Sequence, residues 1–228
     1  LNSPCNPTGA LIEEKELEVI VQKTEEAGIW LVLDLCYERL LHDDAVSHNL
    51  PRVVDKARDR VVLIGSASKT YAMTGWRCGW LLGPQAIVSA CSTIQSHATS
   101  NVSSITQRAV LAALCDDGAC VEEMRAAYRE RRDRFVKLLT AEPEILVDLP
   151  DGACYVFPDI SAFLGTDAIR TSVDFARRLL EESHVAVTPG EAFDAPGYIR
   201  ISYAASLEEL TVGAKRICDF AQSCRSVA

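Results

Sequence analysis

The sequence predicts an α/β protein made of two parts. In the first part, amphipathic helical patterns alternate with short, continuously apolar stretches, which is typical of a sheet covered by helices. Beyond residue 145, short alternating stretches mix with helices, which is typical of a smaller α+β domain. We therefore expect part of a mostly parallel sheet flanked by helices over residues 1–120, and a smaller domain over residues 121–228.

The first helix is expected over residues 13–27. Its apolar residues recur at helical spacing, acids fill its first turn, and Gly28 follows as a stop signal. Residues 29–33 are then continuously apolar, as in a parallel strand that is covered on both faces, and they end at Asp34. The loop that starts with Asp34 therefore lies at the carboxyl end of a strand.

The next elements are a short helix over residues 53–57 and a strand over residues 61–64. Helix and strand thus alternate, which favours right-handed crossovers and ligands at the carboxyl ends of the strands. A polar link over residues 66–79 then leads to a second apolar run at 80–82. Lys69 lies in this link. A lysine beside a buried sheet either pairs with an acid or uses its amine, and a desolvated amine is a good nucleophile toward carbonyls.

Three further helices are expected over residues 85–97, 103–114 and 122–139. The last of them is long and rich in arginine, but its arginines alternate with acids and apolar residues. This pattern favours a solvated helix face over a nucleic-acid surface. We expect this helix, near residues 121–140, to join the two domains.

The C-terminal part is expected to contain short strands over residues 146–147, 152–157, 185–187 and 198–203, and helices over 175–180 and 207–220. In the last strand, alternation places Tyr198, Arg200 and Ser202 on one face. Ile199 and Ile201 lie on the other face. The first face is expected to look toward solvent or a cleft.

Composition and charge exclude several classes of function. The chain has 228 residues with a net charge of -9, so it is expected to bind no nucleic acid. Its nine cysteines include no C-x-x-C pair, which favours free thiols in a reducing, cytoplasmic environment over a disulfide framework. No apolar run approaches the roughly 20 residues of a membrane span, so no membrane association is expected.

A set of polar residues is expected at one rim of the sheet: Lys69, Asp34, Tyr37, a serine and an arginine. The chain has four histidines and none is near this set, which argues against a metal site or a histidine-dependent hydrolase. Pyridoxal phosphate fits each group, because its aldehyde needs an amine, its ring nitrogen an acid, its phenolate donors, and its phosphate an arginine and hydroxyls. A carboxylate about 4 Å from the pyridinium is worth roughly 4 kcal/mol at an effective dielectric near 20.

Each of these residues also has a purely structural interpretation. Lys69 could be a surface lysine in a turn, Asp34 an N-cap and Tyr37 a core aromatic. Arg77 could be part of a structural ion pair and Arg200 an edge-strand charge. The joint occurrence of these residue types, rather than any single one, favours the cofactor interpretation.

Five short motifs follow one another along the chain: Asn-Pro-Thr-Gly at 6–9, Asp34-x-x-Tyr37, Ser66-x-Ser68-Lys69, Gly75-Trp76-Arg77-x-Gly79, and Arg-Ile-Ser-Tyr-Ala at 200–204. In this order they resemble the class I aminotransferases of fold type I, closest to the aspartate aminotransferase branch. The resemblance covers essentially the whole chain. It implies that the two parts are the large cofactor-binding domain and the small C-terminal domain of that fold.

The resemblance implies a role for each matching residue near the cofactor ring. Lys69 would be the catalytic residue, forming a Schiff base with pyridoxal phosphate and later moving a proton between the substrate Cα and C4′ of the cofactor. Asp34 would pair with the pyridine nitrogen. Tyr37 and Asn6 would hydrogen-bond the phenolate oxygen.

The remaining matches concern the phosphate and the substrate. Ser66 and Arg77 would bind the cofactor phosphate, with Ser68 as a further contact. Arg200 would bind the substrate α-carboxylate with its planar guanidinium, a geometry that lysine cannot copy. Because Arg200 lies in the far domain, closure of that domain is expected to complete the site.

The implied activity is transamination between an amino acid, either aspartate or an aromatic one, and a 2-oxo acid such as 2-oxoglutarate. A homodimer with shared active sites is also implied, with residues 99–101 resembling a loop near the neighbouring subunit's cofactor. Two alternatives stay open. One is a lyase or decarboxylase on the same scaffold, and the other is a non-catalytic cofactor-binding sensor domain of a transcription regulator.

The sequence departs from the family pattern at two places. Leu35 replaces the usual acid after Asp34, and Cys36 precedes Tyr37, but neither position is a ligand in the family pattern. The family's glycine-rich phosphate turn and the aromatic residue that stacks on the cofactor ring would precede Asn6. We therefore expect the chain to be a C-terminal fragment lacking an N-terminal part.

Overall fold

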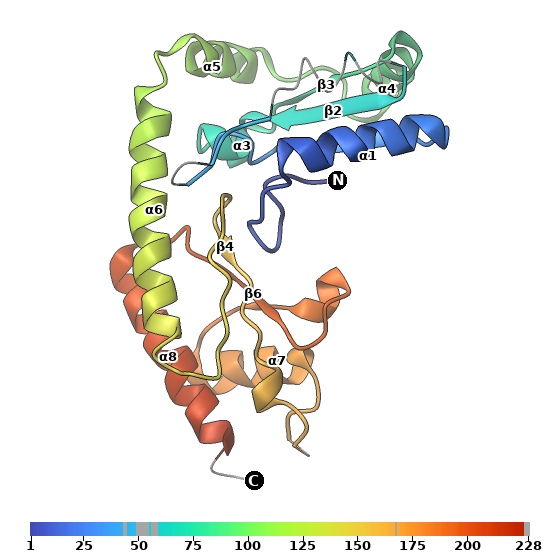
Figure 1. Cartoon of the computed structure of the whole chain (residues 1–228). Helices are drawn as coiled ribbons and strands as arrows, with labels where there is room; N and C mark the ends of the chain where they lie inside the picture. The colour runs from blue at the N-terminus through green and yellow to red at the C-terminus, as the bar shows by residue number, and fades with distance from the viewer. Residues whose placement is uncertain (43–44, 49–54, 56–58, 167, 226–228) are drawn as a thin grey trace. The chain divides into compact units, whose positions relative to one another are not determined.

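The computed structural model describes residues 1–42, 45–48, 55, 59–166 and 168–225 (Figure 1). The chain divides into two compact units, each described by itself below. Unit 1 comprises Leu1–Cys5 and Ala10–Met124, and unit 2 comprises Asn6–Gly9 and Arg125–Ala228. The short helix expected over residues 53–57 lies, except for residue 55, outside the described residues.

Unit 1 contains a three-stranded sheet in the order β1-β2-β3, where β1 is Leu31–Asp34, β2 is Val61–Ser66 and β3 is Gly79–Leu82. β1 and β2 are parallel, as expected, with Leu31 opposite Val61. β3 is antiparallel to β2 because the link between them returns the chain directly along its neighbour. Unit 1 is therefore an α/β layer with one parallel and one antiparallel strand pair in this sheet.

Helix α1 (Glu14–Glu26) covers one face of this sheet (Figure 1). It buries Leu17 and Val21 against a core that includes the strand residues Leu31, Leu33, Leu35, Val61 and Leu63. The expectation that β1 is covered on both faces is wrong for the described chain, because Val32 is 42% exposed. The side chains of β1 therefore alternate between buried and exposed, as in a sheet that is covered on one side.

A short link with two helical turns connects β2 to β3. It contains α3 (Ala67–Thr70) and the 3-10 helix η1 (Thr74–Trp76). Ala67 and Met73 of this link are buried with Val110 in a second small core. Helices α4 (Gln85–Ala98) and α5 (Ser104–Cys115) follow within one residue of their predicted bounds.

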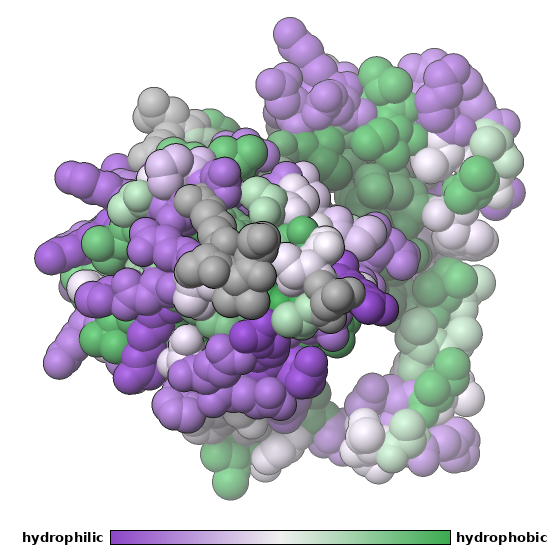
Figure 2. Space-filling view, turned by 90° about the horizontal axis from the view of Figure 1, so that it is seen from below, coloured by the Kyte–Doolittle hydropathy of each residue, from purple (hydrophilic) through white to green (hydrophobic). Residues whose placement is uncertain are grey.

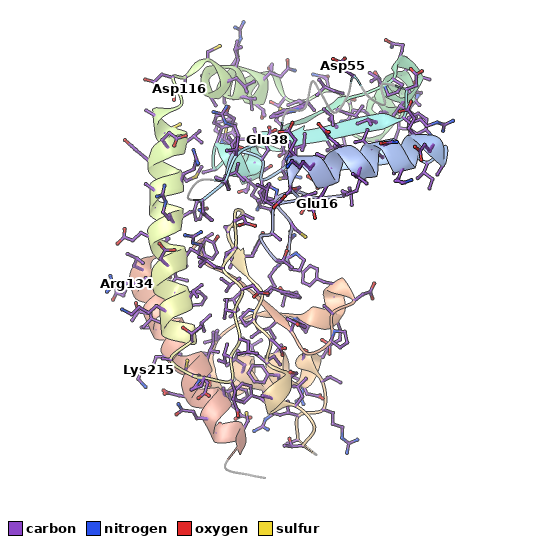
Figure 3. The ribbon with its side chains drawn as sticks, in the orientation of Figure 1. Glu16, Glu38, Asp55, Asp116, Arg134 and Lys215 are labelled. Atoms are coloured by element: carbon purple, nitrogen blue, oxygen red, sulfur yellow. The ribbon has the colours of Figure 1, made fainter. Side chains whose placement is uncertain are left out.

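Helix α6 (Ala119–Leu139) runs across the boundary between the two units. Arg134 is exposed on it, as expected, and is labelled in Figure 3. Arg132 departs from the expected solvated face, since it is only 2% exposed and donates from Nη1 to the Pro150 carbonyl at 2.9 Å. Its position three residues before the buried Phe135 places both on one side of the helix.

Unit 2 contains a three-stranded antiparallel sheet in the order β4-β6-β5. The strands are β4 (Tyr155–Val156), β5 (Thr188–Pro189) and β6 (Ile199–Ser202). The strand expected over residues 185–187 is wrong, because helix α7 (Ser172–Ser183) is followed by a left-handed residue, His184, and strand pairing starts only at Thr188. Of the expected pair at 146–147, Leu146 forms an isolated bridge with Asp159.

Helices α7 (Ser172–Ser183) and α8 (Leu207–Arg225) complete unit 2, together with the 3-10 helices η2 (Ser161–Phe163) and η3 (Gly190–Phe193). The rings of Phe175 in α7 and Phe220 in α8 meet edge to face with centroids 5.0 Å apart. In β6, Ile199 and Ile201 are buried while Arg200 and Ser202 are not, which confirms the predicted alternation.

The face shown in Figure 2 is largely hydrophilic, with separate hydrophobic patches rather than a continuous apolar band. No helix in the described part of the chain is both long enough and apolar enough to cross a membrane.

Candidate active site

The parallel pairing of β1 and β2 brings two predicted residues to the same edge of the sheet. Asp34 is the last residue of β1 and is paired with Ile64, and Ser66 ends β2 two residues later. Both therefore lie at the carboxyl ends of parallel strands, where α/β sheets bind ligands. This edge is the centre of the candidate site in unit 1.

Asp34 is exposed, and the chain around it fixes its carboxylate. Oδ1 of Asp34 accepts a hydrogen bond from the backbone N–H of Cys36 at 2.9 Å. Such a bond to the residue two positions on is typical of an aspartate that opens a turn. The carboxylate is thus positioned by its own loop.

Ser66 begins the helical turn that carries Lys69. Its Oγ accepts a hydrogen bond from the backbone N–H of Ser68 at 3.0 Å, so it caps α3. Ser68 is buried, at 9% exposure, whereas Lys69 is half-buried. The Lys69 Nζ lies 5.9 Å from the ring centroid of Tyr37, which is itself buried at 5% exposure. The turn therefore presents the amine beside the loop that follows Asp34.

Cys36 shows that these groups share one environment. Burial raises the pKa of the Cys36 thiol, and the Asp34 carboxylate raises it further. The Lys69 ammonium and a hydrogen bond with the Ser66 side chain act on the same pKa in the opposite direction. The acid, the amine and the hydroxyl that the sequence predicts therefore all lie around one thiol. Cys36 was not among the predicted site residues. Its position between Asp34 and Tyr37 is the feature of the sequence that could have indicated its place in the site.

Arg77 ends η1 in a left-handed conformation, with φ of 54°. This conformation is uncommon for a residue with a side chain. Its Nη1 donates to the Thr74 carbonyl at 3.0 Å, and the residue is exposed. With Gly65 and Gly79 it contributes to the lining of a cavity of about 520 Å³ in unit 1.

Arg200 is the centre of the predicted site residues in unit 2. Its Nη1 donates to Oδ1 of Asn6 at 2.8 Å, and its Nη2 donates to Oγ1 of Thr188 at 3.1 Å. Its Cζ lies 4.6 Å from the ring centroid of Tyr155 and 5.1 Å from that of Phe193. Thr188 was missed by the sequence analysis because the strand that contains it was expected at residues 185–187.

The predicted site residues thus form two groups. Unit 1 holds six of them: Asp34, Tyr37, Ser66, Ser68, Lys69 and Arg77. Unit 2 holds Asn6 and Arg200, which are hydrogen-bonded to each other. In unit 1 an amine, a carboxylate, hydroxyls and a guanidinium are available at or near the carboxyl ends of the strands. This donor set fits the aldehyde, the ring nitrogen and the phosphate of pyridoxal phosphate.

Comparisons with known proteins identify the family of the chain. The sequence profile of the family "Aminotransferase class I and II" matches residues 1–217. The aspartate aminotransferase of Streptomyces avermitilis is 44% identical over 219 residues, which cover 94% of this chain and 54% of that protein. A probable aspartate/prephenate aminotransferase of Aquifex aeolicus is 39% identical, covering 95% of this chain and 55% of the relative. The chain therefore spans about half the length of the curated relatives it matches.

Solved structures give the same result. The aromatic aminotransferase of Pyrococcus horikoshii superposes with a TM-score of 0.91 at 35% identity, covering all of this chain and 60% of that one. The aspartate aminotransferase of Thermus thermophilus with maleate superposes with a TM-score of 0.87 at 36% identity, covering 96% of this chain and 56% of that one.

The comparisons bear on three expectations from the sequence. The predicted α/β architecture is confirmed, and the solved relatives are aminotransferases with fold type I. The cofactor prediction is confirmed for the family, whose members depend on pyridoxal phosphate. The resemblance that rested on five short motifs is confirmed by the match over residues 1–217, and the chain belongs to the class I and II aminotransferases.

Proposed function

We propose that the protein is a pyridoxal-phosphate-dependent aminotransferase that transfers an amino group between an amino acid, either aspartate or an aromatic one, and a 2-oxo acid such as 2-oxoglutarate. The observation that carries this proposal is the placement of Asp34 and Ser66 at the carboxyl ends of the paired strands β1 and β2, with Lys69 on the helical turn that Ser66 caps. Few cofactors need an amine, an acid and a hydroxyl at the same sheet edge, and pyridoxal phosphate needs all three.

When bound, pyridoxal phosphate supplies an electron sink that stabilises negative charge at the substrate Cα. Lys69 would hold the cofactor through its amine and, once released, remove the proton from the substrate Cα and return it during the exchange. Its half-buried position on the turn after β2 suits this role, because the amine remains reachable while its backbone is fixed. Lys69 is therefore the proposed catalytic residue.

Asp34 would keep the ring nitrogen protonated. Its carboxylate is already oriented by the Cys36 N–H, so binding would not require it to reorganise. Tyr37 would donate to the phenolate oxygen. Ser66, Ser68 and Arg77 would bind the phosphate, for which a guanidinium and hydroxyls are suitable partners.

Asn6 and Arg200 would bind the substrate side of the site. The hydrogen bond from Arg200 engages Oδ1 of Asn6. The amide nitrogen of Asn6 would be the group that donates to the phenolate oxygen, because an amide oxygen only accepts. Among the contacts of the described residues, two of the five N–H groups of Arg200 donate to Asn6 and Thr188. The remaining N–H groups suit a carboxylate, which guanidinium binds in a bidentate manner.

The domain assignment and the assembly belong to the same proposal. Unit 1 would be the C-terminal part of the large cofactor-binding domain, and unit 2 would be the small domain, with α6 joining them. A homodimer with shared active sites in the cytoplasm is proposed from the resemblance to the family.

The names of the relatives favour transamination over the two alternatives. They include aspartate aminotransferases, an aspartate/prephenate aminotransferase and, in Streptococcus mutans, an asparagine–oxo-acid transaminase at 36% identity. None of these names describes a lyase, a decarboxylase or a regulator.

Product analysis tests this proposal. The purified protein is incubated with pyridoxal phosphate, 2-oxoglutarate and either aspartate or phenylalanine, and the products are separated by chromatography. We expect glutamate to form together with the 2-oxo acid of the donor. Release of carbon dioxide or ammonia without glutamate would favour a lyase or decarboxylase, and cofactor binding without any product would favour a sensor domain.

A further inference from the structure

The guanidinium of Arg200 lies over two aromatic rings. Tyr155 of β4 and Phe193 of η3 lie 4.6 Å and 5.1 Å from its Cζ. Stacking against ring faces is favourable for guanidinium groups and restricts their tilt. It does not restrict rotation of the group within its own plane, because a flat ring offers no directional partner there.

Two hydrogen bonds supply that missing restraint. Nη1 donates to Asn6 at 2.8 Å and Nη2 donates to Thr188 at 3.1 Å. Bonds on both terminal nitrogens fix the in-plane orientation, whereas one bond alone leaves the group free to pivot. The Thr188 hydroxyl and the Asn6 amide therefore both contribute to this orientation.

The backbone around Thr188 is fixed as well. Thr188 lies directly opposite Arg200 in the β5–β6 pair, so the two side chains share a face of the sheet. The chain then turns through Gly190, whose N–H donates to the Tyr198 carbonyl at 2.8 Å. A Cβ at Gly190 would lie 2.0 Å from the Ala195 carbonyl oxygen, so this turn is closely packed.

The far end of this turn is attached to helix α7. Ser172, the first residue of α7, donates its N–H to a Glu191 carboxylate oxygen at 2.9 Å. Its hydroxyl accepts from the Gly197 N–H at 2.9 Å. The segment that carries Phe193 is thus bound to one helix end at two points, which holds both the ring and the neighbouring Thr188 in place.

We propose that Thr188 is a positioning residue, which sets the orientation of Arg200 for binding of the substrate α-carboxylate. This inference rests on the proposed function, because it assigns Thr188 a role in the same carboxylate site. Thr188 does not touch the substrate in this account. It acts by restraining Nη2 of Arg200, so that the N–H groups left for the carboxylate point in one direction.

Calorimetric titration with succinate tests the inference, because this dicarboxylate carries no amino group and reports binding without turnover. The cofactor-loaded protein is compared with Thr188→Val, Thr188→Ser and Thr188→Ala. We expect Thr188→Val and Thr188→Ala to weaken succinate binding about tenfold, since a bond to a charged donor is lost. Thr188→Ser keeps the hydroxyl and is expected to bind within about twofold of the unchanged protein. In turnover assays, Thr188→Val should raise KM for the amino acid about tenfold with little change in kcat.

Two further variants separate the possible failures. Thr211→Val is the matched control, since the Thr211 hydroxyl bonds only the Leu207 carbonyl within α8 among its described hydrogen bonds, and succinate binding should stay unchanged. Arg200→Ala should abolish binding. If Arg200→Ala abolishes binding but Thr188→Val does not weaken it, or if Thr188→Ser binds as weakly as Thr188→Val, the role of Thr188 is contradicted and the proposed function stands. If Arg200→Ala binds succinate normally, the carboxylate site and the inference are both contradicted.

Discussion

Asn6 and Arg200 are joined by a hydrogen bond of 2.8 Å although they lie 194 positions apart in the sequence. The segment around Asn6 therefore belongs to unit 2, and the Gly152 N–H donates to the Gly9 carbonyl at 2.9 Å in the same region. Two motifs from opposite ends of the chain are thus part of one structure. The orientation of each side chain depends on the other.

A double-mutant cycle on this pair is the first prediction. Asn6→Ala and Arg200→Ala should each destabilise the protein toward urea, and the double variant should lose less than the sum by about 1 kcal/mol, because the bond can be removed only once. Asn6→Ala combined with Arg177→Ala, an exposed arginine of α7, should be additive within about 0.5 kcal/mol. Additive behaviour of Asn6→Ala with Arg200→Ala would contradict the observed bond.

Gly9 and Gly213 should respond oppositely to alanine. Gly9 has φ of 73°, and a Cβ there would lie 2.3 Å from Cβ of Pro150, so Gly9→Ala should lower the free energy of unfolding by about 1–3 kcal/mol. Gly213 lies within α8 with open space around a Cβ, so Gly213→Ala should raise it by about 0.5–1 kcal/mol. Equilibrium urea unfolding measures both. The same sign for the two variants would contradict the described backbone.

Asp34→Asn should separate charge from structure. Asparagine keeps an oxygen that can accept the Cys36 N–H, so the loop should keep its conformation and the melting temperature should change little. The loss of charge opposite the ring nitrogen should lower kcat about 100-fold. Asp219→Asn, which removes only an exposed ion pair with Lys215 on α8, is the matched control and should keep full activity. Full activity of Asp34→Asn would be incompatible with its proposed role.

Tyr203 should make the protein sensitive to alkaline pH. Its ring is completely buried and its hydroxyl donates to the Ala153 carbonyl at 3.1 Å. Burial raises the pKa of Tyr203 strongly, with the Cys154 side chain as the next cause. The unfolded pKa is near 10, so the contribution of Tyr203 to stability is complete below about pH 10 and is lost as pH rises toward the raised folded value.

The measurement is the free energy of unfolding between pH 8 and pH 11.5. Tyr203→Phe should lower it at pH 8, because a buried hydrogen bond is lost, but its decline above pH 10 should be shallower by up to about 1.4 kcal/mol per pH unit. Equal declines in the two proteins would show that Tyr203 ionises as easily in the folded state as in the unfolded state.

Local patterns predicted most of the elements, because their causes are local. Apolar spacing and flanking residues predicted five of the elements: α1, β2, α4, α5 and β6. The alternation that leaves Arg200 partly exposed followed from the sequence of β6 alone. β5 could not be placed in this way. It has two residues, and only its pairing with β6 makes it a strand, so Thr188 was missed together with it.

The candidate site was predicted in its residue types, but its contacts were not. The five motifs named Lys69 and Asp34, yet no spacing rule shows that the charges of both residues act on the pKa of the Cys36 thiol. Burial of Arg132 was missed for a similar reason, since its partner is the carbonyl of Pro150, a residue far along the chain. Contacts between distant segments depend on the folded backbone, and a single sequence does not contain them.

Reduction of the cofactor-loaded protein with borohydride, followed by mass spectrometry of its peptides, tests the central claim most directly. Borohydride fixes a pyridoxyl group onto the lysine that holds it, and we expect this mass on the peptide containing Lys69. Lys69→Ala should lose the label, whereas Lys23→Ala, which removes an exposed lysine paired with Glu26 on α1, should keep it. Labelling confined to another lysine, or no labelling of the unchanged protein, would contradict the assignment of Lys69 as the residue that holds the cofactor.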